Sequence, residues 1–243
     1  MSALPHSPHA LVTGGGRGIG RAIASALVGA GATVTVLGRN AATLEEAVKA
    51  GAAHFATVAD VSDEDALKAG IAETHARKPI DILIANAGSA ESAPFAKSDS
   101  ALFARMMDVN FMGVVHAVHG VLPGMKDRPY GRIIAIASTA GLKGYAYVSA
   151  YTAAKHAVIG LVRSLALEMA GSKVTVNAVC PGFVNTEILQ TVPEKVLDGM
   201  KEHCWMRRLA EPSEIAAIYT FLASDDASYV NGTTIEASGG MSL

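Results

Sequence analysis

Short apolar runs alternate with longer amphipathic segments along most of this chain. The apolar runs are rich in β-branched residues and read without interruption, as expected of strands that helices cover on both faces. We predict strands at residues 9–13, 33–37, 54–59, 80–85, 132–137, 174–179 and 233–236, and helices at 18–30, 41–50, 63–77, 100–122, 149–170 and 212–223. This alternation indicates an α/β fold, a doubly wound parallel sheet of Rossmann type with about seven strands and helices on both faces.

No Gly/Ser-rich or Pro-rich linker and no internal repeat interrupts the alternation over the 243 residues. A chain of this length leaves one or two domains open, and the missing linker favours a single domain covering residues 1–243. One stretch, residues 182–211, shows no clear period. Long irregular segments in compact domains are usually binding loops, so we predict that this stretch forms the substrate loop.

Composition and charge narrow the function classes. Half of the residues are apolar, 17% are charged, and the formal net charge is −2. Scattered charges give no footprint for nucleic acid or membrane surfaces, so a small molecule is the expected partner. Residues 1–10 lack the pattern of a secretion signal, which favours a cytoplasmic location. Cys180 and Cys204 have no metal-ligand spacing, so we expect buried thiols and no metal site.

A glycine-rich turn directly follows the first predicted strand. Residues 13–20 read TGGGRGIG and open the next predicted helix. Glycine is needed where the backbone turns tightly and where it contacts a pyrophosphate, and a helix N-terminus offers unpaired N–H groups to that anion. An ordinary glycine-rich loop would look similar in isolation. The strand before it and the helix after it favour a dinucleotide-binding site.

Four polar residues are candidates for catalysis. Tyr151 and Lys155 lie one helical turn apart on the same helix face, an arrangement that is often only an ordinary helix pair. Ser138 follows the strand at 132–137, at the end of the sheet where ligands bind, although serine also closes strands as a turn residue. Asn110 lies within the helix predicted at 100–122, where asparagine is mildly unfavourable and could simply face solvent.

Together these motifs resemble the short-chain dehydrogenases/reductases, most closely reductases of 3-oxoacyl thioesters (acyl carrier protein or coenzyme A) and polyketide ketoreductases. The resemblance continues through Asp60-Val61, Asn86-Ala87-Gly88, Pro181-Gly182 and Gly239-Gly240. Ala85 departs from it, because many members have asparagine there. The resemblance implies catalytic roles for Asn110, Ser138, Tyr151 and Lys155. It implies cofactor binding by Gly14, Gly16, Arg17, Gly18, Ile19, Gly20, Arg39, Asp60, Val61, Asn86, Ala87, Gly88, Tyr151, Lys155, Pro181, Gly182, Val184 and Thr186.

The end of the second strand predicts which nicotinamide cofactor is used. A carboxylate there would repel a 2′-phosphate on the adenosine ribose, and a basic residue would attract it. By resemblance, Gly38 stands where NAD-preferring members have aspartate and Arg39 where NADP-preferring members have a basic residue, with Arg17 as a second contact. Both arginines could instead be solvated surface charges. We predict NADP(H), with NAD(H) as the alternative.

The resemblance also implies a mechanism. We expect the nicotinamide hydride to reach a carbonyl carbon, while Ser138 and Tyr151 bind the carbonyl oxygen and Tyr151 supplies the proton. An ammonium beside the phenol, together with a nicotinamide cation, would lower the pKa of Tyr151, each unit corresponding to about 1.4 kcal/mol. Lys155 would also position the cofactor ribose, and a water held near Asn110 would return a proton to Tyr151.

The substrate is less well defined. An apolar set is expected to line its site: Leu142, Tyr147, Phe183, Val184, Leu189, Val192, Trp205 and Met206. Core packing is an alternative for each of them. A 3-oxoacyl thioester reductase or 3-hydroxyacyl dehydrogenase is the leading hypothesis, followed by a reductase of free ketones, sugars or secondary alcohols and by a dinucleotide sensor without turnover.

Two further expectations concern contacts with other molecules. Arg207 and Arg208 could bind a coenzyme A phosphate or an acidic carrier protein, but a structural role before the helix at 212–223 is favoured. The resemblance implies a homotetramer in which residues 101–122 and 149–170 pair across an interface, and the alanine-rich helices are compatible with it.

Overall fold

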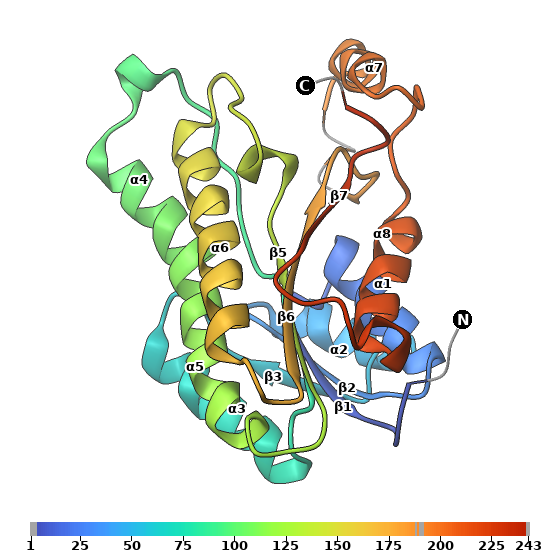
Figure 1. Ribbon diagram of the computed structural model, residues 1–243. Helices are drawn as coiled ribbons and strands as arrows, with labels where there is room; N and C mark the ends of the chain where they lie inside the picture. The colour runs from blue at the N-terminus through green and yellow to red at the C-terminus, as the bar shows by residue number, and fades with distance from the viewer. Residues whose placement is uncertain (1–3, 188, 190–191, 242–243) are drawn as a thin grey trace.

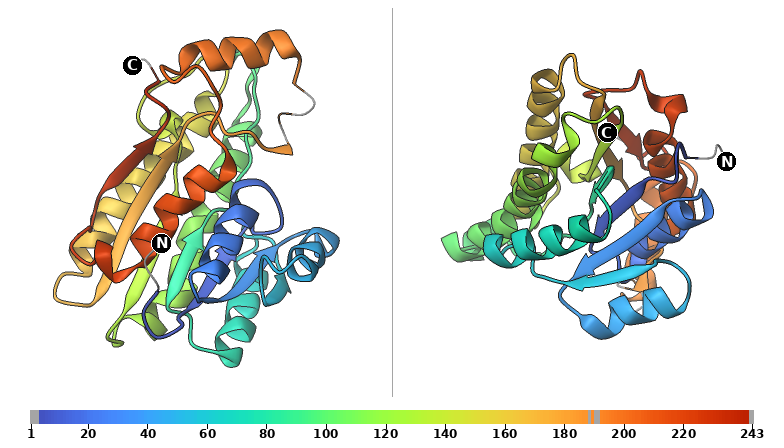
Figure 2. Two further views of the ribbon diagram at one scale, coloured as in Figure 1. Left: turned by 90° about the vertical axis from the view of Figure 1, so that its right-hand side faces the viewer. Right: turned by 90° about the horizontal axis from the view of Figure 1, so that it is seen from below.

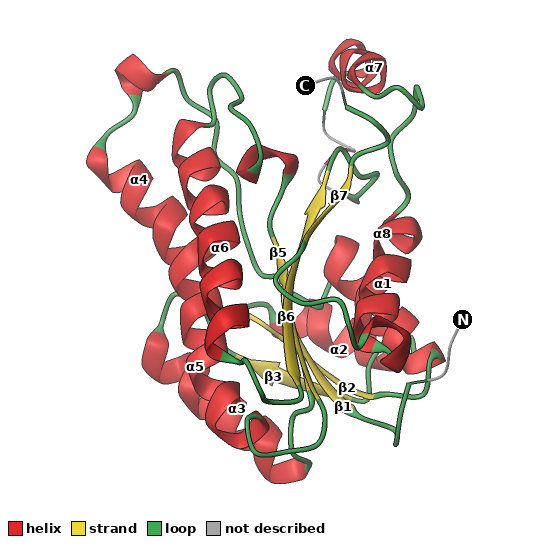
Figure 3. Ribbon diagram, in the orientation of Figure 1, coloured by secondary structure: helices red, strands yellow, loops and turns green. Residues whose placement is uncertain are grey.

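Seven strands form one parallel sheet in the order β3-β2-β1-β4-β5-β6-β7 (Figure 3). The computed structural model describes residues 4–187, 189 and 192–241. The strands are β1 His9–Thr13, β2 Thr33–Gly38, β3 Phe55–Val58, β4 Ile82–Ala85, β5 Gly131–Ile136, β6 Val174–Pro181 and β7 Thr234–Ala237. The predicted doubly wound parallel sheet of Rossmann type is thereby confirmed.

Helices cover both faces of the sheet (Figure 1). On one face lie α1 Gly18–Gly29, α2 Ala41–Lys49 and α8 Pro212–Ala223, and on the other lie α3 Glu64–Arg77, α4 Ser100–Met107, α5 Gly113–Met125 and α6 Ser149–Glu168. The helix α7, Glu194–His203, lies apart from both layers, beyond the end of β7 (Figure 2). The loops contain the short 3-10 helices η1 Phe95–Lys97, η3 Thr139–Gly141 and η5 Asp225–Ala227.

The core consists of two apolar clusters separated by the sheet. Within β1, Ala10 and Val12 pack among the residues of α1 and α8, whereas Leu11 points to the opposite cluster with α3, α5 and α6. Because both faces are buried, every residue of the strand can be apolar. This explains why the strands read as continuous apolar runs rather than as alternating ones.

Two predicted segments are corrected by the structure. The helix predicted at 100–122 is α4, a π-helical turn η2 at Asp108–Met112, and α5, which ends at Met125. The substrate loop predicted at 182–211 contains the helix α7, and its residues 188, 190 and 191 lie outside the described residues. All residues of α7 are partly or fully exposed. Its apolar positions, Val196, Leu197 and Met200, form a helical stripe that is too short to stand out within the irregular stretch.

Capping distinguishes α1 from α2, α3 and α4. The Asn40, Asp63 and Asp99 side chains accept backbone N–H groups in the first turns of α2, α3 and α4. Arg17, at the corresponding position of α1, makes no such bond, and the first turn of α1 holds no acidic residue. The N-terminal N–H groups of α1 therefore lack a side-chain partner and can bind an anion.

By length and composition alone, one helical stretch, Ser100–Met125, is apolar enough to cross a membrane, with a mean hydropathy of 1.2. Core helices of globular proteins pass the same test. Ala117, Val118 and Val121 of this stretch are buried in the core cluster next to the sheet.

Candidate active site

A cavity of about 900 Å³ lies at the carboxyl ends of the central strands. It is lined by most of the predicted site residues: Gly14, Gly16, Arg17, Gly18, Ile19, Gly20, Arg39, Asp60, Val61, Asn86, Ala87, Gly88, Asn110, Tyr151, Lys155 and Thr186. Ser138, Pro181, Gly182 and Val184 do not line it. The structure thus brings together residues from turns that are far apart in sequence.

The turn after β1 and the loop after β4 are joined closely, and we call residues 13–20 and 86–88 the cradle. A Cβ atom on Gly20 would lie 2.2 Å from the Gly14 carbonyl oxygen, and one on Gly14 would lie 2.9 Å from Ala87 Cα. Thr13 Oγ1 accepts the backbone N–H groups of Asn86 and Ala87, both at 3.0 Å. Only glycine allows this approach, and Gly14 also has a φ of 65°.

The cradle fits the pyrophosphate of a dinucleotide. It leads into the N-terminus of α1, where the Arg17 backbone is extended and no side chain caps the helix. The same cavity is lined by Gly16 and Gly18, which leave the backbone accessible. Glycine backbone and free helix N–H groups are the elements that bind such an anion.

The rim of the cavity at β2 and β3 carries charged groups. Arg39 Nη1 lies 3.5 Å from Asp60 Oδ2, and the Arg39 side chain is largely exposed. Burial raises the pKa of Asp60, but hydrogen bonds from the Ser62 N–H and hydroxyl, with the charge of Arg39, outweigh this effect and hold that pKa below its ordinary value. Gly38 places no side chain between this pair and the cavity.

Asn110 lies in the π-helical turn η2 and is fully buried. Its amide Nδ2 donates to the carbonyl oxygens of Ser89 at 2.8 Å and Met106 at 3.0 Å, and its Oδ1 accepts the Ser89 N–H at 3.2 Å. In an α-helix the backbone N–H of residue 110 would use the Met106 carbonyl. The side chain competes for that acceptor, which accounts for the opened turn.

Lys155 is buried beneath the cavity with its ammonium aimed at backbone oxygen. Its Nζ donates to the Ile136 carbonyl at 3.0 Å, and burial lowers the pKa of Lys155 to about 8. A Cβ atom on Gly88 would lie 2.7 Å from Asn110 Oδ1 and 3.5 Å from Lys155 Nζ. The Gly88 backbone therefore lies between the Asn110 and Lys155 side chains and close to both.

Tyr151 lies beside Lys155, as the helical spacing predicts, with Nζ 5.6 Å from the centre of the phenol ring. Burial raises the pKa of Tyr151, and the neighbouring Ser138 side chain opposes that shift only in part. Without a cofactor, desolvation of the phenolate thus exceeds its stabilisation by the protein's own groups. The lowered pKa expected for Tyr151 also requires the bound nicotinamide cation, so it stays a prediction. The phenol is protonated at neutral pH and can donate its proton.

Ser138 lies directly after β5, at the N-cap of η3. Its Oγ accepts the Ala140 N–H at 3.1 Å, and its backbone is extended. The side chain contributes to the surroundings of the phenol but not to the lining of the large cavity. Ser138 thus lies beside Tyr151 and does not line the cavity that contains the cradle.

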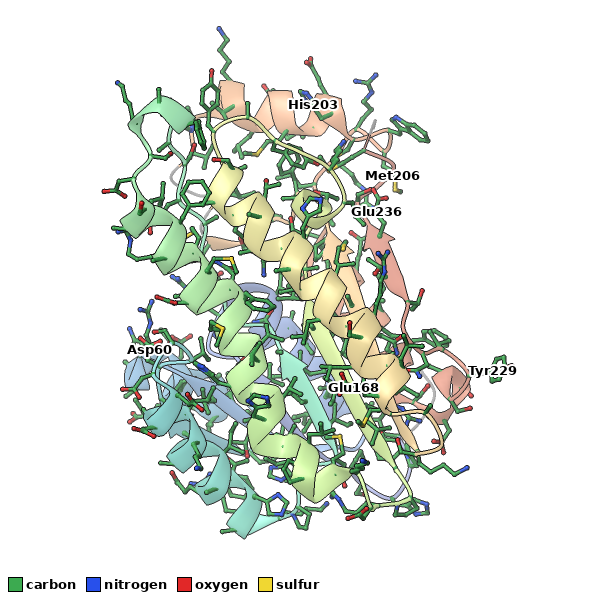
Figure 4. All side chains as sticks on the ribbon, turned by 60° about the vertical axis from the view of Figure 1, so that its left-hand side comes forward. Asp60, Glu168, His203, Met206, Tyr229 and Glu236 are labelled. Atoms are coloured by element: carbon green, nitrogen blue, oxygen red, sulfur yellow. The ribbon has the colours of Figure 1, made fainter. Side chains whose placement is uncertain are left out.

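The predicted substrate residues divide into exposed and buried sets. Tyr147, Trp205 and Met206 are 63%, 74% and 59% exposed, and Leu142 is 37% exposed. Phe183, Leu189 and Val192 are half-buried. Val184 is buried in the core cluster of α1 and α8, so core packing is the better interpretation for it. Figure 4 shows Met206 near His203, far from Asp60 across the molecule.

The two arginines after α7 make local contacts. Arg208 forms a two-point ion pair with Glu214 at 2.6 and 2.7 Å, and Glu214 also accepts the Glu211 N–H in a capping box of α8. Arg207 donates to the Glu202 carbonyl at 3.0 Å. These contacts favour the structural role for Arg208, as expected from its place before α8.

Sequence reasoning missed part of the cavity. Asn40 and Thr43 at the start of α2, Ser89 after the cradle and Glu187 after Thr186 also line it. Glu187 Oε2 lies 3.6 Å from the position of a Cβ atom on Gly18. The cap motif at Asn40 was a usable signal for the start of α2, whereas nothing in the local sequence placed Glu187 at the N-terminus of α1.

Both cysteines, Cys180 and Cys204, are free and buried. Across the described part of the chain, no group of three or more His, Cys, Asp or Glu side chains is placed to hold a metal ion.

Comparison with known proteins agrees with this geometry. Residues 8–197 match the family model described as short chain dehydrogenase, so the chain belongs to that family. Acetoacetyl-CoA reductase of Shinella zoogloeoides is 42% identical over 235 residues, which cover 95% of this chain and 97% of the relative. The 3-oxoacyl-[acyl-carrier-protein] reductase MabA of Mycobacterium tuberculosis (strain ATCC 25618 / H37Rv) is 34% identical over 96% of this chain and 92% of its own length.

A solved structure shows the same architecture. The 3-oxoacyl-[acyl-carrier protein] reductase from Brucella melitensis superimposes with a TM-score of 0.91 at 33% identity, covering 97% of this chain and 91% of the other. The chain is an oxidoreductase of the short-chain dehydrogenase family, whose enzymes use nicotinamide dinucleotides.

Proposed function

We propose that this protein is an NADP(H)-dependent reductase of 3-oxoacyl thioesters, which interconverts a ketone and a secondary alcohol. The observation that carries the proposal is the convergence of Asn110 and Lys155 at Gly88, with Tyr151 beside Lys155, in a cavity that the glycine-rich cradle also lines. Ser138 neighbours the phenol. The names of the relatives support thioesters over other ketones.

The proposed mechanism assigns one task to each side chain. A bound nicotinamide dinucleotide supplies the hydride, which is the cofactor's own chemistry. The Ser138 hydroxyl donates a hydrogen bond to the carbonyl oxygen as negative charge develops on it. The Tyr151 phenol, kept protonated by burial, gives that oxygen its proton.

Lys155 and Asn110 support the phenol. The Lys155 ammonium beside the ring favours the phenolate that forms after proton donation, and it lies where a cofactor ribose would be held. Asn110 keeps the π-helical turn open through its bonds to Ser89 and Met106. A water held at this turn would return a proton to Tyr151.

NADP(H) is the proposed cofactor, with NAD(H) as the alternative. Arg39 and Arg17 both line the cavity, and both are exposed cations at its rim. Arg39, which already pairs with Asp60, would bind the 2′-phosphate of NADP as a second partner, since a guanidinium binds phosphate in a forked geometry. The start of α2, with Asn40 and Thr43, lines the same corner.

A spectrophotometric substrate panel tests the proposal. NADPH is mixed with acetoacetyl-CoA, with simple cyclic and aryl ketones, and with sugars, and its oxidation is followed. Turnover confined to the thioester supports the proposal. Turnover only with free ketones or sugars would favour the second hypothesis, and silence across the panel together with tight NADPH binding would favour a dinucleotide sensor.

Cytoplasmic residence and a homotetramer belong to the same proposal. Much of the Ser100–Met125 stretch is apolar and not buried in the monomer, which suits pairing of this helical layer with a second copy. Light scattering should give a mass of four chains at micromolar concentration, and a monomer would contradict the assembly.

A further inference from the structure

Met241, the last described residue, is buried although it follows the last strand, β7. Only 4% of its surface is exposed. It follows Gly239 and Gly240, whose φ angles of 65° and 71° let the backbone turn back after β7. Figure 1 shows this end of the chain beside α7.

The Met241 sulfur is linked to the loop that carries Ser138. The Tyr145 hydroxyl lies 3.9 Å from Met241 Sδ and 3.0 Å from Thr139 Oγ1. Thr139 is the residue after Ser138 and is itself buried. Through one phenol, the sulfur therefore contacts the segment that positions the serine hydroxyl.

The same sulfur rests on the start of the substrate loop. A Cβ atom on Gly182 would lie 2.9 Å from Met241 Sδ, so the sulfur packs directly on the Gly182 backbone. The Gly182 N–H donates to the Ala237 carbonyl at 3.0 Å, and the Met241 N–H donates to Ser238 Oγ at 3.2 Å. The end of β7 and the turn after β6 are thus joined around the methionine.

The backbone next to Met241 also holds the exposed segment after α7. The N–H groups of Trp205 and Met206 donate to the carbonyls of Gly240 at 3.2 Å and Gly239 at 3.1 Å, and Cys204 pairs with Met241 in an antiparallel bridge. The Met206 side chain packs at Gly239, where a Cβ atom would lie 3.6 Å from Met206 Cβ. Residues 204–206 are anchored by this tail.

We propose that Met241 is a positioning residue for the substrate. Three segments contact Met241: the loop that carries Ser138 and Thr139, the turn at Gly182, and residues 204–206. Among these contacts, the three segments meet only at the Met241 side chain and backbone. A methionine fills such an irregular gap well, because its side chain is unbranched and its sulfur is polarizable. Met241 acts through these segments, and the proposal rests on the proposed reductase function.

The test compares matched methionine variants. Met169, at the far end of α6, is buried to the same degree as Met241 (5% exposed), so Met169→Ala controls for lost packing. We expect Met241→Ala and Met169→Ala to lower the melting temperature similarly. Only Met241→Ala should raise the KM for acetoacetyl-CoA, by about tenfold, because small misplacements of substrate are costly. The Kd for NADPH should stay within about twofold in both, because the cradle is untouched.

Two further variants keep the test decisive if Met241→Ala folds poorly. Met241→Leu keeps an apolar side chain of similar size, so its KM for acetoacetyl-CoA should return most of the way to the wild-type value. Tyr145→Phe removes only the hydroxyl between the sulfur and Thr139, and it should raise the KM in the same direction by a smaller factor. Unchanged KM values in Met241→Ala, or in both Met241→Leu and Tyr145→Phe when the first does not fold, would overturn the proposal.

Trp205, the only tryptophan, supplies a readout that needs no substrate. Its fluorescence anisotropy should fall in Met241→Ala and not in Met169→Ala, because only the first loosens residues 204–206. Equal anisotropy in both variants would contradict the proposal even if the enzyme reduces no thioester. Failure of the proposed function would instead show in the wild-type panel, so the two failures are distinguishable.

Discussion

The cradle and the substrate side of the site are built in different ways. In the cradle, backbone meets backbone, and a Cβ atom on Gly20 would lie 2.2 Å from the Gly14 oxygen. On the substrate side, Gly182 and residues 204–206 are joined to the C-terminal tail by a few backbone hydrogen bonds, the Met241 sulfur and one close backbone contact at Ser238, and Trp205 is 74% exposed. A pyrophosphate is common to all dinucleotides and can be bound by backbone. A substrate differs between enzymes and must be recognised by side chains.

Tyr151 lies where the cradle side and the substrate side meet. Replacing it should have the largest effect on activity. Tyr151→Phe removes the proton donor and leaves both regions folded. We expect kcat to fall by about 10²–10⁴-fold, the usual contribution of a general acid, with the Kd for NADPH nearly unchanged. Steady-state kinetics and fluorescence titration measure the two quantities. Activity above a few per cent of wild type would overturn the assignment.

Adding a methyl group inside the cradle should weaken cofactor binding rather than act first on the catalytic step. In Gly20→Ala the new methyl group meets the Gly14 oxygen and Asn86 Nδ2, at 2.2 and 2.5 Å, so backbone must shift. We expect a loss of roughly 1–3 kcal/mol in the free energy of unfolding, as for an overpacked core. NADPH binding should weaken by at least about a hundredfold, because the anion contacts depend on this backbone.

Gly29, in the same helix α1, provides the control. A Cβ atom there meets nothing within 4 Å. Gly29→Ala should leave NADPH affinity unchanged and alter the free energy of unfolding by less than about 1 kcal/mol in the stabilising direction. Equal affinity losses in both variants would show that the cradle is not the binding element.

Arg39 is a side-chain contact on the cofactor side of the site, which otherwise binds through backbone. Reversing its charge therefore tests this one side chain. Arg39→Asp places a carboxylate beside Asp60 and should repel the 2′-phosphate. We expect the preference for NADPH over NADH, as the ratio of kcat/KM values, to fall by about 10–100-fold. Equal use of NADH by the wild-type enzyme would contradict the predicted preference.

The last predicted effect concerns pH. Burial lowers the pKa of Lys155 to about 8, so the ammonium is present below that pH and is lost above it. If the ammonium supports Tyr151, kcat/KM should be level below pH 8 and fall by up to about tenfold per pH unit above it, since this parameter reports groups of the free enzyme. A profile that stays level to pH 10 would argue against this role.

The sequence predicted the cradle better than the substrate side for a physical reason. Glycines at 14 and 20, the strand before them and the helix after them are local features, and the parallel sheet follows from the alternating elements. The spacing of Tyr151 and Lys155 likewise depends on one helix. These parts could be predicted because short-range geometry determines them.

The remaining parts depend on contacts between distant residues. Glu187 reaches the N-terminus of α1, and Met241 reaches Gly182, through turns that no local pattern specifies. The raised pKa of Tyr151 arises from burial, which the sequence alone did not weigh against the charge of Lys155. The π-helical turn at Asn110 similarly needs Ser89 from a different loop.

The most direct test of the central claim is a crystal structure with NADP⁺ and a 3-hydroxyacyl-CoA bound. We expect the pyrophosphate to lie against the cradle and the substrate hydroxyl to lie within hydrogen-bond distance, about 2.5–3.0 Å, of both Tyr151 Oη and Ser138 Oγ. A nicotinamide bound away from Tyr151, or a substrate hydroxyl that contacts neither side chain, would contradict it.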